Sequence, residues 1–124
     1  MFLLDTNIAS YWMRGDQKII NQIKNYRPCD LSISIITLAE ILYGIGKSDI
    51  KKTERSKKLF SIRSQLELYS FDESAAAKYG VVRTCLEKRG IPISEGDLQI
   101  AAVAVANDLV LVTHNTKEFP GSGI

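Results

Sequence analysis

The sequence predicts an α/β fold of three layers, in which a central parallel sheet lies between helices on both faces. Short apolar runs alternate with longer segments of helical periodicity along the 124 residues. The last apolar run, Leu109–Val112, is continuous rather than alternating, which is typical of a strand buried on both faces. This alternation favours right-handed crossovers and a parallel sheet over a helical bundle or a β-sandwich.

The composition is that of an ordinary globular chain. With 124 residues, 45% of them hydrophobic and 24% charged, the sequence supports one cored domain spanning residues 1–124. A disordered or fibrous protein would have a different composition. The formal net charge of +2 is too small to indicate a nucleic-acid binder, so charge placement must decide that question.

The first quarter of the chain predicts one strand and two helices. The strand is Phe2–Leu4, and a helix over Thr6–Met13 follows it directly. After a turn at Arg14–Asp16, isoleucines at helical spacing predict a second helix over Gln17–Tyr26. That helix is expected to end before Pro28, because proline disfavours the helical conformation in the residue preceding it.

The middle of the chain predicts one more strand and two more helices. Leu31–Ile35 alternates like a strand. Thr37 can cap a helix that runs to about Ile45, where two nearby glycines fit a helix stop. A charged helix is expected from Ile50 to about Leu66.

The last half of the chain continues the same alternation. Leu68–Phe71 predicts a short strand, and Asp72 opens a long helix that closes at Lys88–Gly90 with cations in its last turn. A further helix, Ser94–Asn107, precedes the final strand. The resulting order of elements is that of a parallel sheet with helical crossovers.

Several features indicate a reduced, non-membrane environment. Cys29 and Cys85 lack the C-x-x-C spacing of a zinc or redox site, so we interpret both as reduced thiols in packed positions. The chain reaches Asp5 too early for the apolar core of a signal peptide. The longest apolar stretch, Ile100–Ala106, is far below the roughly 18 residues of a membrane span. We therefore expect a cytoplasmic protein with no membrane partner.

Asp5 directly follows the first predicted strand. In open α/β sheets the chemistry gathers outside the carboxyl ends of the strands, which is where this carboxylate would lie. However, Asp5, Thr6 and Asn7 are all good helix N-caps. Capping and metal binding are therefore about equally supported by these residues alone.

Glu40 is the only charged residue between Asp30 and Lys47. If its carboxylate is buried in this apolar segment, a partner must compensate the charge. The helical wheel nevertheless places Glu40 roughly opposite the apolar stripe, which contains Leu38, Ile41, Leu42 and Ile45. A buried and a solvent-facing carboxylate both remain open.

Asp97 lies three residues after Ser94 and imitates a capping box, with Asp in place of Glu or Gln. Capping does not explain Gly96, which weakens an otherwise well-made helix start. A glycine there is expected if backbone or substrate passes close by, which favours a site. After the last strand, Thr113 and Asn115 offer polar oxygen atoms at the same sheet edge, although a simple turn explains them equally well.

Taken together, four segments resemble the VapC family of PIN domains, in the right order and spacing over nearly the whole chain. They are Leu3–Asn7, Thr37–Gly44, Asp97–Ala102 and Leu111–Phe119, supported by Phe71–Ala76 and by the Tyr79–Gly80 pair. The resemblance implies a PIN-like, Rossmann-like fold and a metal-dependent endoribonuclease that acts as the toxin of a toxin-antitoxin pair.

The resemblance also implies the site. Asp5, Glu40 and Asp97 would bind one or two Mg²⁺ or Mn²⁺ ions with help from Asn115, while Thr6, Asn7 and Thr113 would support them. Converging carboxylates repel one another, and a hard divalent cation neutralises them. Many PIN nucleases carry a fourth acid where this chain has Asn115, which puts a second metal in doubt. The segment after Pro120 also stops before the final strand expected of relatives.

Three partners follow from the resemblance: an RNA substrate such as tRNA, a VapB-like antitoxin, and a second copy of the chain in a homodimer. Two basic clusters are either solvated faces or contacts to RNA phosphates: Lys47, Lys51, Lys52, Arg55, Lys57, Lys58 and Arg63, then Arg83, Lys88 and Arg89. One apolar set is either core or a groove for an antitoxin helix: Ile8, Tyr11, Trp12, Met13, Leu38, Ile41 and Leu42.

Three other classes of protein remain as alternatives. A haloacid-dehalogenase-like phosphatase needs a second Asp two positions after Asp5, where this chain has Asn7. A phosphoacceptor receiver domain needs paired acids after its first strand, and only one is present. A catalytically silent PIN-like module that binds RNA or a protein would not need the three acids that this chain carries.

Overall fold

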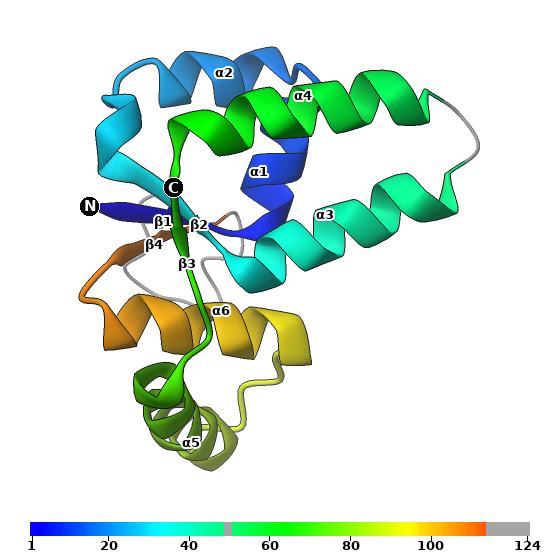
Figure 1. The fold of residues 1–124 in the computed structure, drawn as a ribbon. Helices are drawn as coiled ribbons and strands as arrows, with labels where there is room; N and C mark the ends of the chain where they lie inside the picture. The colour runs from blue at the N-terminus through cyan, green and yellow to red at the C-terminus, as the bar shows by residue number, and fades with distance from the viewer. Residues whose placement is uncertain (49–50, 114–124) are drawn as a thin grey trace.

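The computed structural model describes residues 1–48 and 51–113. Within these residues, four parallel strands form one sheet in the order β3-β2-β1-β4. The strands are β1 (Phe2–Leu4), β2 (Leu31–Ser34), β3 (Glu67–Tyr69) and β4 (Val110–Val112). The predicted three-layer α/β/α fold with a central parallel sheet is confirmed (Figure 1).

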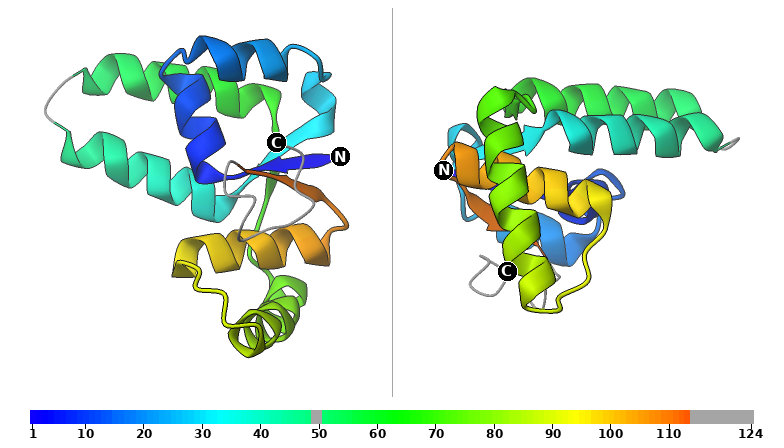
Figure 2. Two further views of the ribbon diagram at one scale, coloured as in Figure 1. Left: turned by 180° about the vertical axis from the view of Figure 1, so that it is seen from behind. Right: turned by 90° about the horizontal axis from the view of Figure 1, so that it is seen from below.

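Helices cover both faces of the sheet (Figures 1 and 2). One face carries α1 (Thr6–Met13), α2 (Gln17–Ile23), α3 (Ile35–Lys47) and α4 (Lys52–Gln65), and the other carries α5 (Glu73–Lys88) and α6 (Glu95–Ala106). A short 3₁₀ turn, Pro28–Asp30, precedes β2. Helices α3 and α4 run side by side and project beyond the sheet as a hairpin (Figure 2).

The period of two along the strands produces two hydrophobic clusters, one on each face. In β1, Leu4 packs into the larger cluster under α1–α4, while Leu3 packs into the smaller cluster against Ile100 and Val103 of α6. Both leucines are fully buried. The continuous apolar run of β1 is therefore explained by burial on both faces.

The start and the end of α3 differ from the sequence prediction. Ser34, rather than Thr37, caps the helix, because the Ser34 hydroxyl accepts a hydrogen bond from the Thr37 backbone N–H at 3.1 Å. The strand consequently ends one residue before Ile35. The helix also continues through both glycines to Lys47, since packing of its buried face overrides the low helix propensity of glycine.

Other boundaries shift by one to three residues. Helix α2 ends at Ile23, and the following turn places the Tyr26 ring edge-on against Phe2, with 4.9 Å between ring centroids. Strand β3 starts at Glu67 because its register pairs Glu67 with Ser32 of β2. The expected start of the charged helix at residue 50 lies outside the described residues.

Cys29 and Cys85 are free thiols, as expected, but both are exposed, so their interpretation as packed residues is wrong. Cys29 lies in the 3₁₀ turn, and Cys85 lies on the outward side of α5. The interpretation followed the general tendency of free cysteines to be buried, and neither position obeys it. Among the described helices, none combines the length and the apolar character of a membrane span.

Candidate active site

Asp5 lies where β1 ends and α1 begins. Its side chain is 6% exposed, and its Oδ1 accepts a hydrogen bond from the Ile8 backbone N–H at 2.8 Å. Its own backbone N–H donates to the Val112 carbonyl oxygen at 3.0 Å, which ties this position to the end of β4. The capping interpretation is therefore correct, and the same carboxylate lies at the carboxyl edge of the sheet.

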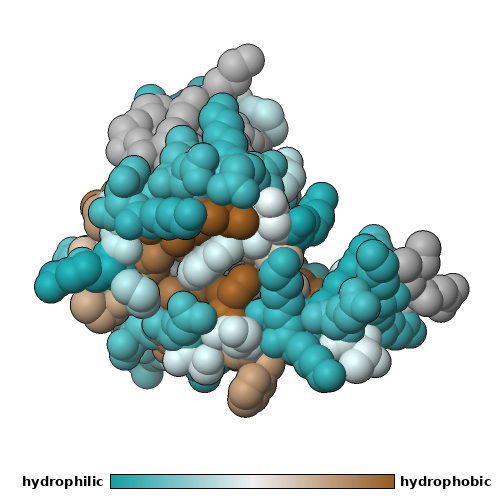
Figure 3. Space-filling model, turned by 90° about the horizontal axis from the view of Figure 1, so that it is seen from above, coloured by the Kyte–Doolittle hydropathy of each residue, from teal (hydrophilic) through white to brown (hydrophobic). Residues whose placement is uncertain are grey.

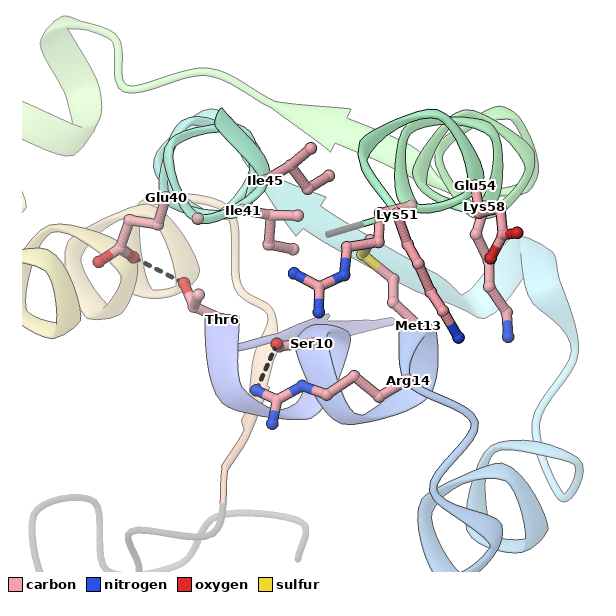
Figure 4. A pocket seen from close by; sticks show the side chains of 12 residues that line it. Thr6, Ser10, Met13, Arg14, Glu40, Ile41, Ile45, Lys51, Glu54 and Lys58 are labelled. Carbon is pink, nitrogen blue, oxygen red and sulfur yellow. Dashed lines mark hydrogen bonds between the residues drawn. The ribbon is translucent and has the colours of Figure 1, made fainter. Parts of the chain in front are cut away.

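Glu40 is exposed on α3, and its carboxylate is held toward α1 (Figure 4). The Thr6 hydroxyl donates to Glu40 Oε1 at 2.6 Å, and Thr6 Oγ1 also lies 3.1 Å from Thr37 Oγ1. Thr37 in turn contacts the buried cap Ser34. A chain of hydroxyl groups therefore joins the ends of β1 and β2 and gives Glu40 a defined direction.

Gly96 permits the second contact of Glu40. A Cβ atom on Gly96 would lie 2.8 Å from Glu40 Oε2, closer than real Cβ atoms come to other atoms. The Glu40 carboxylate therefore lies against this glycine, and a side chain at position 96 would require the exposed end of Glu40 to move. Asp97 follows directly and is half-buried, with its backbone N–H donating to the Ser94 hydroxyl at 3.3 Å.

Glu40 thus contacts the residue after Asp5 and the residue before Asp97. The three acids therefore belong to neighbouring segments: Asp5 caps α1, Asp97 lies in the first turn of α6, and Glu40 lies on α3. Among residues 1–48 and 51–113, however, no three acidic, cysteine or histidine side chains converge closely enough to hold a metal ion. One oxygen of Asp5 and one of Glu40 accept hydrogen bonds from the protein instead.

The remaining predicted site residues differ in their surroundings. Thr6 is half-buried and bonded to Glu40, whereas Asn7 is exposed on α1. Thr113 is 2% exposed directly after β4, at the same edge as Asp5. Asn115 lies outside the described residues.

A contact between α5 and α6, which the sequence did not predict, fixes the start of α6. The Tyr79 hydroxyl donates to Glu95 Oε1 at 2.6 Å and accepts from Arg83 at 3.0 Å. The hydrogen bond from Tyr79 lowers the pKa of Glu95, and the same bond raises the pKa of Tyr79. Tyr79 and Arg83 stand one helical turn apart, but nothing in the sequence indicates their tertiary partner.

A groove of about 540 Å³ opens between α1, α3 and α4 beside Glu40 (Figure 4). Thr6 and Glu40 line it near the acids, and basic side chains from α1 and α4 line it farther away. Its apolar surface comes from Met13, Ile41 and Ile45. Ile8 of the predicted apolar set is core, and Leu42 is exposed.

Comparison with known proteins agrees with the fold. Residues 2–120 match the family model described as the PIN domain. Ribonuclease VapC2 of Rickettsia felis is 39% identical over 121 residues, covering 96% of this chain and 90% of the relative. The tRNA(fMet)-specific endonuclease VapC of Shigella flexneri is 32% identical over 122 residues, covering 98% of this chain and 92% of the relative.

Solved structures show the same relationship. VapBC2 from Rickettsia felis, bound to a DNA fragment from its promoter, contains a chain with a TM-score of 0.86 and 36% identity, covering 98% of this chain and 92% of that one. FitAcB from Neisseria gonorrhoeae also contains a similar chain, with a TM-score of 0.86 and 30% identity. The match covers 96% of this chain and 91% of that one.

These matches, together with the parallel sheet between helices, show that the chain belongs to the PIN-domain family. Its likeness to the VapC ribonucleases over nearly the full length makes it a VapC-type nuclease within that family.

Proposed function

We propose that this chain is an endoribonuclease that depends on Mg²⁺ or Mn²⁺ and acts as a VapC-like toxin. The observation that carries the proposal is the double contact of Glu40, which links the segment carrying Asp5 to the segment carrying Asp97. This double contact supports a shared site for three carboxylates from distant parts of the sequence. Helix capping explains Asp5 alone and does not explain why Glu40 approaches both segments.

The donor atoms suit a hard divalent cation, which prefers carboxylate oxygens. Asp5, Glu40 and Asp97 would hold the ion, assisted by Asn115. The described structure lacks a ready-made cluster of three acids, so the exposed Glu40 side chain must turn toward the other two. When bound, such an ion supplies an acidified water and neutralises charge on the phosphoryl oxygens.

The protein's own groups position the acids. Thr6 holds Glu40 at the edge, and Thr37 supports Thr6. The Ser34 and Ser94 caps fix the first turns of α3 and α6. No nucleophilic side chain is required, so hydrolysis proceeds without a covalent enzyme intermediate.

We also propose the partners. Several similar solved structures are VapBC complexes, which supports a VapB-like antitoxin as inhibitor. The Shigella flexneri relative is named for tRNA(fMet), which supports a structured RNA such as tRNA as substrate. The active form is a homodimer in the cytoplasm, where both RNA and antitoxin are made.

The test is RNA cleavage by the purified protein. We expect cleavage with Mg²⁺ or Mn²⁺, none with EDTA, and none from Asp97→Asn, which keeps the size of the side chain. The control is Glu73→Gln, which removes an exposed carboxylate at the start of α5 and should cleave normally. Full activity of Asp97→Asn, with a circular dichroism spectrum like that of the parent, would refute the site.

A second candidate function, a catalytically silent RNA-binding module, is favoured by the absence of a formed three-acid cluster in the described residues. Such a module would bind RNA equally well with Asp97→Asn and would not cleave it under any metal condition. The cleavage experiment therefore separates the two candidates.

A further inference from the structure

The first turn of α6, which carries Asp97, is weakly held by its own helix. The Ser94 hydroxyl accepts from the Asp97 backbone N–H at 3.3 Å, whereas the side-chain caps of α1, α3 and α5 accept at 2.8, 3.1 and 2.9 Å. Gly96 stands in the same turn, and glycine loses more conformational freedom than any other residue when it becomes helical. The position of Asp97 therefore depends on contacts from outside the helix.

Tyr79 of α5 supplies such a contact. Its hydroxyl donates to Glu95 Oε1 at 2.6 Å, a distance typical of a strong hydrogen bond to an ionised carboxylate. Gln99 also donates to Glu95 Oε1, at 3.1 Å, so the same carboxylate joins the first turn of α6 to the second. Glu95 thereby ties the first turn both to α5 and to the rest of α6.

Tyr79 is itself fixed on α5. Arg83, one helical turn further along, donates to the Tyr79 hydroxyl oxygen at 3.0 Å and forms an ion pair with Glu87. The Tyr79 ring packs edge-on against Phe71, with 6.2 Å between the ring centroids. The hydroxyl that reaches Glu95 therefore has a defined place and direction.

Different sides of this turn face different neighbours. Glu95 contacts α5, while Gly96 faces the Glu40 carboxylate of α3. Glu40 is exposed, and the α3–α4 hairpin to which it belongs projects from the sheet with a mostly hydrophilic surface (Figure 3). Helix α5, in contrast, packs against α6 and contributes Ala75 to the buried cluster beneath it. The fixed support of this turn is therefore α5, and Tyr79 is a polar group through which it acts.

We propose that Tyr79 is a positioning residue, which holds the first turn of α6 through Glu95 so that Asp97 can bind the divalent ion. Residues two apart in a helix lie roughly 200° apart around its axis, so Glu95 and Asp97 leave α6 on different sides. Tyr79 therefore acts through the backbone of the turn and not as a ligand. This inference rests on the proposed metal-dependent ribonuclease and adds to it the residue that keeps one of its acids in place.

The experiment follows the turn and the metal separately. Tyr79→Phe keeps the ring against Phe71 and removes only the hydroxyl. In EDTA, we expect the backbone N–H groups of Asp97 and Leu98, which both donate to Ser94, to exchange with solvent about tenfold faster by NMR, because the turn opens more often. Calorimetry should show Mn²⁺ binding weakened by about tenfold.

Tyr26→Phe is the matched control. The Tyr26 ring also packs edge-on against a phenylalanine, Phe2, but beside the cluster under α1–α4. This variant should keep the parental exchange rates and Mn²⁺ affinity. Glu95→Ala should speed the exchange as Tyr79→Phe does, and adding Tyr79→Phe to it should speed the exchange no further, since the hydroxyl has already lost its partner.

Three results would overturn the positioning role. The first is parental exchange in Tyr79→Phe. The second is faster exchange throughout the chain, which would indicate a general loss of stability instead of a local effect on α6. The third is faster exchange at the first turn of α6 together with parental Mn²⁺ affinity, which would separate the turn from the ion.

Failure of the positioning role is distinguishable from failure of the nuclease. If Tyr79→Phe weakens Mn²⁺ binding and Asp97→Asn abolishes it, but the parent never cleaves RNA with Mg²⁺ or Mn²⁺, the positioning role stands and the proposed activity is wrong. If metal-dependent cleavage occurs and Tyr79→Phe matches the parent in exchange and Mn²⁺ binding, the activity stands and the positioning role is wrong.

Discussion

At the scale of single residues, Asp5 combines two roles that the sequence presents as alternatives. Its carboxylate caps α1, and it also lies at the carboxyl edge of the sheet, where we propose the metal site. The roles are compatible because the positive end of a helix dipole stabilises an ionised carboxylate. The start of α1 therefore helps to keep a negative group buried at this position.

Two substitutions separate these roles. Asparagine caps a helix about as well as aspartate, so Asp5→Asn should keep the stability of the parent while abolishing cleavage. Asp5→Ala should also abolish cleavage. Because it removes the cap, it should in addition lower the unfolding free energy by about 1 kcal/mol relative to the parent. Urea unfolding and RNA cleavage measure the two quantities, and cleavage at the parental rate by Asp5→Asn would show that Asp5 acts only as a cap.

At the scale of elements, the first turn of α6 is shaped by its contact with α3. Gly96 faces the Glu40 carboxylate, and the contact between Tyr79 and Glu95 ties the same turn to α5. The helix therefore starts less favourably than its cap alone would allow, since glycine in a helix costs roughly 0.5–1 kcal/mol relative to alanine. What the turn gains is room for a carboxylate beside Asp97.

Gly96→Ala tests whether the glycine lowers helix stability in order to leave room for the Glu40 carboxylate. The substitution should leave the unfolding free energy unchanged or raise it by up to about 1 kcal/mol, because the exposed Glu40 side chain can move aside. The displaced carboxylate should weaken Mn²⁺ binding several-fold, as measured by calorimetry.

Gly80→Ala is the control, since no atom lies within 4 Å of a Cβ at that position of α5. It should stabilise the protein without changing Mn²⁺ affinity. If both alanine variants bound Mn²⁺ like the parent, the contact between Gly96 and Glu40 would have no role in holding the ion.

At the scale of the whole molecule, stability comes from two apolar clusters, and the acidic edge contributes little to it. The larger cluster lies between the sheet and α1–α4, and the smaller one lies under α6. The fold should therefore persist without metal. A bound ion would add only the free energy of its binding to the native state.

Metal removal makes that expectation measurable. EDTA should stop cleavage but leave a cooperative unfolding transition. Adding Mg²⁺ at about 100 times its Kd should stabilise the parent by about 2.7 kcal/mol, and this gain should be absent from Asp97→Asn. Unfolding by EDTA alone at room temperature, or equal Mg²⁺ stabilisation of the variant, would contradict the proposed site.

Much of the fold was predictable because burial on both faces gives the strands continuous apolar runs, as in Leu109–Val112. Gly96 indicated a close approach at the start of α6, because a glycine in a capped helix start needs a physical cause. The cap at Ser34 was missed because Ser34 and Thr37 have similar capping propensities. Arg14 and the contact between Tyr79 and Glu95 depend on tertiary neighbours, which local patterns do not encode.

The pairing of β1 with β4 has a consequence for the order of events during synthesis. Phe2 lies beside Val110, so the strand that leads into Asp5 acquires this neighbour only after more than a hundred further codons have been read. Contacts between such distant segments form late and slowly. A ribosome making this chain therefore carries an incomplete acidic edge until β4 has been synthesised, which would delay nuclease activity until then.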